Sequence, residues 1–319
     1  IEIPNGVTSI GQYAFNNCSS LTSVYLLNPT AINITNSNTF SSTPSTKVLF
    51  VPINATGYST SWGKTKWSAV NYVMVPTDTV NYKLNDINTI ETFNSNNKTE
   101  TLSIPSTVTY NDNTYSVNKL SRNSLANDNK MKTLTISSGI NTIEASALSG
   151  CNNLETISIP ESVSEIDNHA FWMCRNLKNI TLPNTLTYLK PEMFVDCISL
   201  ETITIPNGIT KIPFRMFEGC KNLKTVNLPD TITDISNNAF ENCYALESIV
   251  LPKNLKKLRP WTFLNCQSLK DVIIPDGVTS ILGEVFSGCS SIESIVIPDS
   301  VDALAFDVFN ECINLESIT

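Results

Sequence analysis

The sequence has little of what catalytic, nucleic-acid-binding or membrane-spanning proteins usually need. Its 319 residues contain one histidine, His169, so a catalytic triad or a histidine-based metal site has only one place to form. The nine cysteines include no C-x₂-C pair, which argues against a zinc site. The net charge of −8 argues against the clustered basic face that nucleic acid demands. No apolar run approaches the roughly 18 residues of a membrane span.

What the sequence does contain is a repeat of 23 residues marked by cysteine. The cysteines of this repeat are Cys151, Cys174, Cys197, Cys220, Cys243, Cys266, Cys289 and Cys312. Aligned on cysteine, the blocks share the frame L-x-x-I-x-I-P-x-x-V-x-x-I-x-x-x-A-F-x-x-C-x-x. A fixed period of roughly 20 to 29 residues that opens with L-x-x-L-x-L predicts a leucine-rich repeat solenoid.

One block cannot bury its apolar positions alone, so each coil must pack against its neighbours. The I-x-I alternation has a period of two and predicts one short strand per coil. Successive strands would form a parallel sheet on one face with a spacing of about 4.8 Å. On the other side of the coil, Pro191 and Pro260 stand where a helical turn would begin, a position that tolerates proline. We therefore expect one short helical or 3₁₀ turn per coil there.

The eight periodic cysteines have two possible states. Stacked cysteines in adjacent coils would lie about 5 Å apart, which is within the range of a disulfide. They occupy, however, a slot in which the repeat places a buried apolar side chain, and free cysteine behaves as a small hydrophobic residue. We expect buried, unpaired thiols and keep the disulfide as the alternative.

The period divides the chain into three parts. Residues 1–75 are expected to be the last coil and the C-terminal cap of a first array, and residues 76–130 a linker, a β-hairpin cap and the long first coil of a second array. Residues 131–319 would form the regular 23-residue array. The cap carries an aromatic cluster, Tyr58, Trp62, Trp67 and Tyr72, for which a sugar-stacking platform is the alternative. Because the chain begins and ends within repeat patterns, we expect it to be part of a longer protein.

The frame I-P-x-x-V-T-x-I-x-x-x-A-F-x-x-C-x-x-L-x-x-I resembles the BspA-like, or Treponema pallidum type, leucine-rich repeat. The V-P, Y and W of residues 51–67 are similar to that family's usual terminator. The Y-K-L of residues 82–84 and the I-P-S-T-V-T-Y of residues 104–110 are similar to its array opening. The resemblance implies a cell-surface or secreted protein, adhesion to host matrix proteins or to other microbes, and no catalytic residues.

Positions that break the repeat are candidates for function. The outward position after the first Ile of each strand carries a hydroxyl or an amide in five coils, and then Val250, Ile273 and Val296. With Asp271 nearby, these three residues would form an exposed apolar stripe on the β face, which is presumed to be concave. Such a stripe can mark a partner site, although β-branched residues are also good strand formers.

A second candidate surface lies on the turn side. The two positions between Phe and Cys are usually polar, but Trp172-Met173 and Val195 break this rule in adjacent coils. Aromatic residues and methionine are enriched at interfaces, so Trp172 and Met173 could contribute to recognition. Local packing, or a contact with the first array, is the alternative. His169 is expected to be an ordinary turn residue.

Next to the β-face stripe, one column alternates in charge through eight coils. It reads Lys132, Glu155, Lys178, Glu201, Lys224, Glu247, Lys270 and Glu293. Exposed pairs of this kind contribute about 0.2 to 1 kcal/mol each. We expect the column to be structural and to penalise a slip of one coil.

Together these features predict a non-enzymatic binding module of the cell surface or of a secreted protein, without a cofactor. Its partner would be a protein of the host matrix or of a microbial surface, or a glycan. Neither nucleic-acid binding nor membrane insertion is expected. A passive spacer in a larger surface protein is the main alternative, and it should have uniformly polar faces. A hydrolytic enzyme would need convergent acid and base groups in a pocket.

Overall fold

The structure is a computed structural model, which describes residues 1–4, 6–34, 38–52, 55–59, 62, 67, 69–75, 79–86, 89–95, 99–110 and 112–319. They form two compact units. Unit 1 comprises Ile1–Phe93 and Thr107–Ser116, and unit 2 comprises Asn94–Ser106 and Val117–Thr319. Of the segment expected to join two arrays, residues 76–78 lie outside the described residues.

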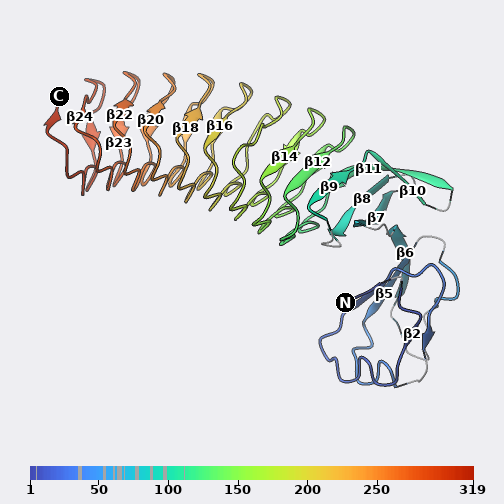
Figure 1. Cartoon of the computed structure of the whole chain (residues 1–319). Helices are drawn as coiled ribbons and strands as arrows, with labels where there is room; N and C mark the ends of the chain where they lie inside the picture. Colours follow the sequence, from blue (N-terminus) through green and yellow to red (C-terminus); the bar gives the residue numbers. More distant parts are fainter. Residues whose placement is uncertain are drawn as a thin grey trace. The chain divides into compact units, whose positions relative to one another are not determined.

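Unit 1 is built from short strands (Figure 1). Its strands are β1 (Glu2–Ile3), β2 (Ser9–Ile10), β3 (Ser23–Leu26), β4 (Asn33–Ile34), β5 (Val48–Pro52), β6 (Ala69–Val75), β7 (Val80–Asp86) and β10 (Thr107–Tyr110). β8 (Thr89–Ser95) and β11 (Asn113–Leu120) contain residues of both units. β1, β3, β5 and β6 pair in parallel in that order, and β2 pairs in parallel with β4. The β6–β7 and β10–β11 pairs are antiparallel, as the alternation of residues 80–117 predicts.

The aromatic cluster of unit 1 is part of its core. Tyr58, Trp62 and Trp67 are all buried. The indole N–H of Trp62 donates to the carbonyl of Ile32 at 3.3 Å, and that of Trp67 donates to the carbonyl of Trp62 at 3.1 Å. Phe40 packs on both indoles. The alternative of a sugar-stacking platform is therefore wrong for these three rings, because none of them faces solvent.

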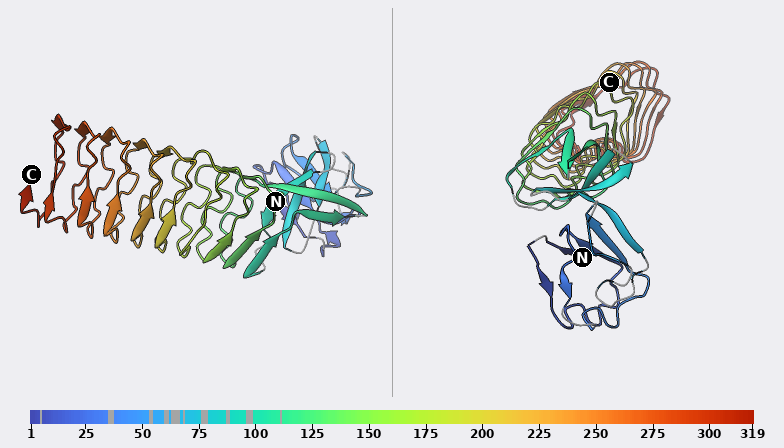
Figure 2. Two further views of the ribbon diagram at one scale, coloured as in Figure 1. Left: turned by 90° about the horizontal axis from the view of Figure 1, so that it is seen from above. Right: turned by 90° about the vertical axis from the view of Figure 1, so that its right-hand side faces the viewer.

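Unit 2 is a solenoid whose coils stack in register (Figures 1 and 2). Parallel strands recur at 23-residue intervals, as in the pairing of Thr133 with Thr156 and of Val250 with Ile273. The first ladder contains β9 (Thr101–Ile104), β12 (Thr133–Ile136), β14 (Thr156–Ser158), β16 (Thr202–Thr204), β18 (Thr225–Asn227), β20 (Ser248–Val250), β22 (Asp271–Ile273), β24 (Ser294–Ile295) and β26 (Ser317–Ile318). The predicted leucine-rich repeat solenoid with a parallel sheet is confirmed.

A second, shorter ladder follows the proline of each coil. It contains β13 (Thr142–Ile143), β15 (Glu165–Ile166), β17 (Lys211–Ile212), β19 (Asp234–Ile235), β21 (Lys257–Leu258), β23 (Ser280–Ile281) and β25 (Ala303–Leu304). Both ladders are interrupted in the coil between residues 174 and 197, where only Asn179 forms isolated bridges, to Thr156 and Thr202.

The core of unit 2 consists of continuous apolar columns. One column is a stack of phenylalanine rings with neighbouring centroids 5.3 to 5.8 Å apart. Its members are Phe171, Phe194, Phe217, Phe240, Phe263, Phe286 and Phe309. Because each ring packs on the rings of the adjacent coils, the coils stabilise one another.

All nine cysteines are free thiols, and the eight periodic ones are buried. The thiol of Cys174 donates to the carbonyl of Leu148 at 3.2 Å, and every periodic cysteine repeats this bond one coil further on. The carbonyl of Leu148 also accepts the backbone N–H of Cys151 in its own coil. The expectation of buried, unpaired thiols is confirmed, and each thiol fills the second lone pair of a carbonyl.

The predicted helical or 3₁₀ turn in each coil is wrong. The described residues contain no α-helix, and hence none that could cross a membrane. Each coil instead has two consecutive turns with left-handed residues four apart, such as His169 (φ 56°) and Met173 (φ 58°). Left-handed residues cannot continue a right-handed helix. The N–H groups of Phe171 and Met173 donate to carbonyls of the next coil, those of Met193 and Val195.

The alternating charge column forms ion pairs between coils. Lys132 lies 3.0 Å from Glu100, and Lys224 lies 3.5 Å from Glu201. All four side chains are largely exposed, so each pair contributes little to stability. Glu100 extends the column one coil toward the N-terminus.

Candidate functional site

Two surfaces of unit 2 carry the residues that break the repeat. The first is the stripe of Val250, Ile273 and Val296 on the face of the first ladder, called the β-face stripe here. Its side chains are exposed by 81%, 79% and 65%. Val250 and Ile273 are direct partners in the β20–β22 pair, and Asp271 is exposed at the start of β22.

The preceding coils carry a hydrogen-bonded surface at the equivalent positions. Thr156 donates to Thr133 at 3.2 Å, Thr202 to Asn179 at 3.3 Å, and Asn227 to Thr204 at 3.0 Å. The β-face stripe replaces these polar groups with side chains that form no hydrogen bonds. Covering it therefore removes apolar area from water without breaking polar contacts, which favours association by about 25 cal/mol per Å².

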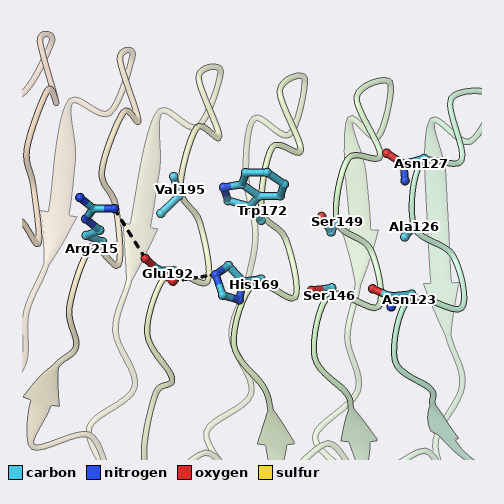
Figure 3. Close-up of a pocket in the computed structure, with 10 residues that line it drawn as sticks. All are labelled: Asn123, Ala126, Asn127, Ser146, Ser149, His169, Trp172, Glu192, Val195 and Arg215. Carbon is cyan, nitrogen blue, oxygen red and sulfur yellow. Dashed lines mark ion pairs between the residues drawn. The ribbon is translucent and has the colours of Figure 1, made fainter.

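The second surface is an open pocket of about 680 Å³ on the turn side of the solenoid (Figure 3). We call it the turn-side pocket. It is lined by Asn123, Ala126, Asn127, Ser146, Ser149, His169, Trp172, Glu192, Val195 and Arg215. These residues come from five successive coils, so no single segment of the chain contains the pocket.

The repeat geometry explains how these residues meet. Asn123, Ser146, His169, Glu192 and Arg215 follow one another at intervals of 23 residues, and all five have a positive φ of 53° to 59°. Ala126, Ser149, Trp172 and Val195 form a second row, three residues further along each coil. Because the coils are in register, each row lies across the stack (Figure 3).

Trp172 is the largest step in the second row. Its indole is 39% exposed and follows the much smaller Ala126 and Ser149, so the ring forms a wall beside a shallow floor (Figure 3). The imidazole of His169 meets the indole edge-on, with centroids 6.3 Å apart at 87°. This contact fixes the base of the tryptophan while the rest of its ring faces solvent.

At the other end of the pocket, charged side chains form a chain of contacts. His169 Nε2 lies 2.6 Å from Glu192 Oε2, and Glu192 Oε1 lies 3.8 Å from the guanidinium of Arg215. Arg215 also pairs with Glu218 at 2.9 Å. The carboxylate of Glu192 is therefore shared between two cationic or N–H-bearing partners, and the three side chains hold each other in place.

Glycine helps to place Asn127 at the N-terminal edge of the pocket. Gly150, one coil later, has a φ of +72°, and a Cβ atom built there would lie 2.3 Å from Asn127 Oδ1. Only glycine leaves room for the amide at this point and adopts the left-handed conformation without strain. Any other residue at position 150 would push Asn127 out of its place.

The pocket does not have the geometry of a hydrolase. Ser146, His169 and Glu192 occupy one row, but the imidazole uses both nitrogens elsewhere, with Nδ1 2.8 Å from the amide of Asn168 and Nε2 facing Glu192. Neither nitrogen is left to take a proton from a serine hydroxyl, as a general base must. Among the described residues no group of histidine, cysteine and carboxylate side chains could hold a metal ion.

The structure brings together only part of the predicted site. Trp172 lies in the turn-side pocket, whereas Met173 is half-buried beside it and does not line the pocket. The β-face stripe and Asp271 form the separate surface described above. The prediction that His169 is a turn residue agrees with its left-handed conformation, but its partners Glu192 and Arg215 were missed. The 23-residue spacing of these three residues is the signal that identifies them.

Comparisons with known proteins agree on the repeat. The family model described as BspA type leucine-rich repeat region matches residues 1–113, 91–213, 118–247 and 190–316. A leucine-rich repeat protein from Bacteroides ovatus has 32% sequence identity and a TM-score of 0.70, over 76% of this chain and 64% of that chain. The chain thus spans about 64% of the length of that protein.

Two further solved structures are less similar. A leucine-rich repeat protein from Eubacterium ventriosum has 21% identity and a TM-score of 0.50 over 90% of this chain and 82% of that chain, which supports the fold alone. The Treponema pallidum leucine-rich repeat protein has 24% identity and a TM-score of 0.49 over 68% and 90%. No curated protein matches the chain.

Proposed function

The chain belongs to the BspA-type leucine-rich repeat family, and on this basis we propose that it is a non-enzymatic binding module of the cell surface or of a secreted protein. Its partner is a protein of the host matrix or of another microbe, bound through the β-face stripe. The observation that carries the proposal is the exposure of three consecutive apolar side chains, Val250, Ile273 and Val296, by 65 to 81%.

Three features support a protein partner at this surface. The stripe lies on regular strands, which hold the side chains in a fixed array. Asp271 gives it a charged neighbour that can set the orientation of a partner, as charges at the rim of an interface do. The polar coils that precede it show that the repeat itself does not require apolar side chains at this position.

The alternative function is a passive spacer that holds another domain away from the cell. A spacer is expected to have uniformly polar faces, and neither the β-face stripe nor Trp172 fits that expectation. The family resemblance accommodates both functions, so the stripe is what favours binding.

The test is binding to a panel of immobilised matrix proteins and mucins. We expect saturable binding to one partner by the native chain and a loss of at least about tenfold in affinity, or about 1.4 kcal/mol, in the double variant Val250→Asp/Ile273→Asp. The matched control is Thr135→Asp/Ser158→Asp, which adds the same charges to a register pair on the same face.

Circular dichroism must first show that both variants are folded. Equal binding by the native chain and both variants would place the partner elsewhere on the molecule. Equal loss in both variants would indicate a general effect of negative charge and not a site. Absence of binding to every protein would favour the spacer.

A further inference from the structure

We propose that the turn-side pocket is a carbohydrate-binding site that takes a neutral pyranose residue of a glycan, stacked on Trp172. This site is separate from the β-face stripe and does not depend on the function proposed for it. No residue of the stripe lines the pocket.

The first argument is the exposed indole. A pyranose presents an apolar face of C–H groups and a rim of hydroxyls, so it needs a flat apolar surface beside polar groups. Trp172 provides a partly exposed ring with its base held by His169. An aromatic side chain that is apolar on its faces and wet at its edge is well suited to such a two-sided ligand.

The second argument is the set of polar groups beside the ring. Asn123, Asn127, Ser146 and Ser149 line the side of the pocket that precedes Trp172 (Figure 3). In the described part of the chain, no hydrogen bond occupies the side chains of Asn123, Ser146 or Ser149. Amides offer donors and acceptors together, and hydroxyls do the same, which matches the alternating demands of sugar hydroxyls.

The third argument is the distribution of charge. Glu192 is paired with His169 and Arg215, and Arg215 is paired with Glu218, so the charged groups compensate one another. The polar side chains on the opposite side of Trp172 are uncharged. A neutral sugar therefore fits better than an anionic one, which would have to break an ion pair to reach Arg215.

The size of the pocket is also suitable. A volume of about 680 Å³ lies within the range of roughly 300 to 1,000 Å³ that small ligands occupy. It is open, and its residues come from five coils, so the neighbouring residues of an oligosaccharide could continue along the stack while one pyranose occupies the floor beside Trp172.

The experiment is a screen of the whole chain on a glycan array that presents terminal glucose, galactose, N-acetylglucosamine and N-acetylgalactosamine. The best glycan is then titrated in solution by calorimetry. We expect Trp172→Ala to weaken binding at least about tenfold. The matched control is Trp261→Ala, which removes a tryptophan from the turn of a coil outside the pocket and should leave binding unchanged.

A second variant tests the floor without touching the tryptophan. Ser149→Trp fills the space beside Trp172 and should abolish glycan binding. Because the ligand is uncharged, the affinity should change by less than about twofold between 50 and 500 mM NaCl, since salt screens only charge interactions. The Val250→Asp/Ile273→Asp variant should bind the glycan as the native chain does, which separates this site from the β-face stripe.

Three results would overturn the proposal. They are the absence of binding to any neutral glycan, full binding by a folded Trp172→Ala or Ser149→Trp variant, and a tenfold loss of affinity with added salt. The last result would indicate an anionic ligand held by Arg215 and His169.

Discussion

In every coil of unit 2 the cysteine has a role that an aliphatic residue could not fill. The thiol is small enough for the buried slot and donates to a carbonyl of the preceding coil. Burial raises the pKa of the Cys151 thiol to about 12 from an ordinary value of 9.0, and it raises the pKa of Cys174 and Cys197 well above that value. Thiols of this kind are inert because the thiolate is the nucleophile.

The native chain should therefore react with Ellman's reagent at one thiol only. Cys18 is exposed, whereas the eight periodic cysteines are buried. At pH 8 we expect about one rapidly reacting thiol per chain in buffer and all nine in guanidinium chloride. The variant Cys18→Ser is the control and should bring the native value close to zero. Rapid reaction of several thiols in buffer would contradict the packing of this column.

The same thiols should make stability fall in alkali. Their pKa is higher in the folded chain than in the unfolded one, so the unfolded chain releases protons first as the pH rises above 9.0. Their contribution is complete below pH 9 and is lost between pH 9 and about 12, at about 1.4 kcal/mol per pH unit for each fully buried thiol. Urea midpoints at pH 8, 9, 10 and 11 test this. A midpoint that is constant to pH 11 would exclude it.

Within one coil, the strands were predictable and the turns were not. The I-x-I-P pattern marks strands such as β16 and β20, because alternation and proline have local causes. The turns depend on left-handed residues, for which the usual signals are glycine and asparagine. Here His169, Glu192 and Arg215 take that conformation, so their residue types suggest a helical turn. Hydrogen bonds to the next coil stabilise these turns, and such bonds are not visible in one block.

The phenylalanine column should be a main source of stability between coils. Phe217 is fully buried, and its ring lies 5.8 Å from Phe194 and 5.4 Å from Phe240. Phe217→Ala removes both ring contacts and leaves a cavity, so we expect a loss of about 3 to 5 kcal/mol in the free energy of unfolding. Urea denaturation followed by circular dichroism provides the measurement.

The control for that variant lies three residues away. Phe214 is 40% exposed, and its ring carries the guanidinium of Arg215 at 5.0 Å. Phe214→Ala should therefore cost about 1 kcal/mol or less. Similar losses for the two variants would mean that the ring column does not link the coils.

Over the whole solenoid, register creates surfaces that no single segment contains. The β-face stripe could be predicted, because its residues share one column and differ from the template in a simple way. The turn-side pocket could be predicted only at Trp172, because Ser146, Ser149 and Glu192 are ordinary residues for a turn. What makes them a pocket is the contrast in size between neighbouring coils, which depends on the stacking of five coils.

If register governs the molecule, the length of a deletion should matter more than its position. Deleting residues 221–243 removes one period of 23 residues and leaves every apolar column aligned. It places Glu201 beside Glu247, a like-charge contact that costs about 1 kcal/mol or less. We expect a cooperative thermal transition with a melting temperature lowered by about 5 °C or less. Deleting only residues 221–231 would shift every later column out of line and should abolish the cooperative transition, because each coil is stabilised mainly by its neighbours. Equal melting of the two variants, followed by circular dichroism, would show that the coils do not depend on register.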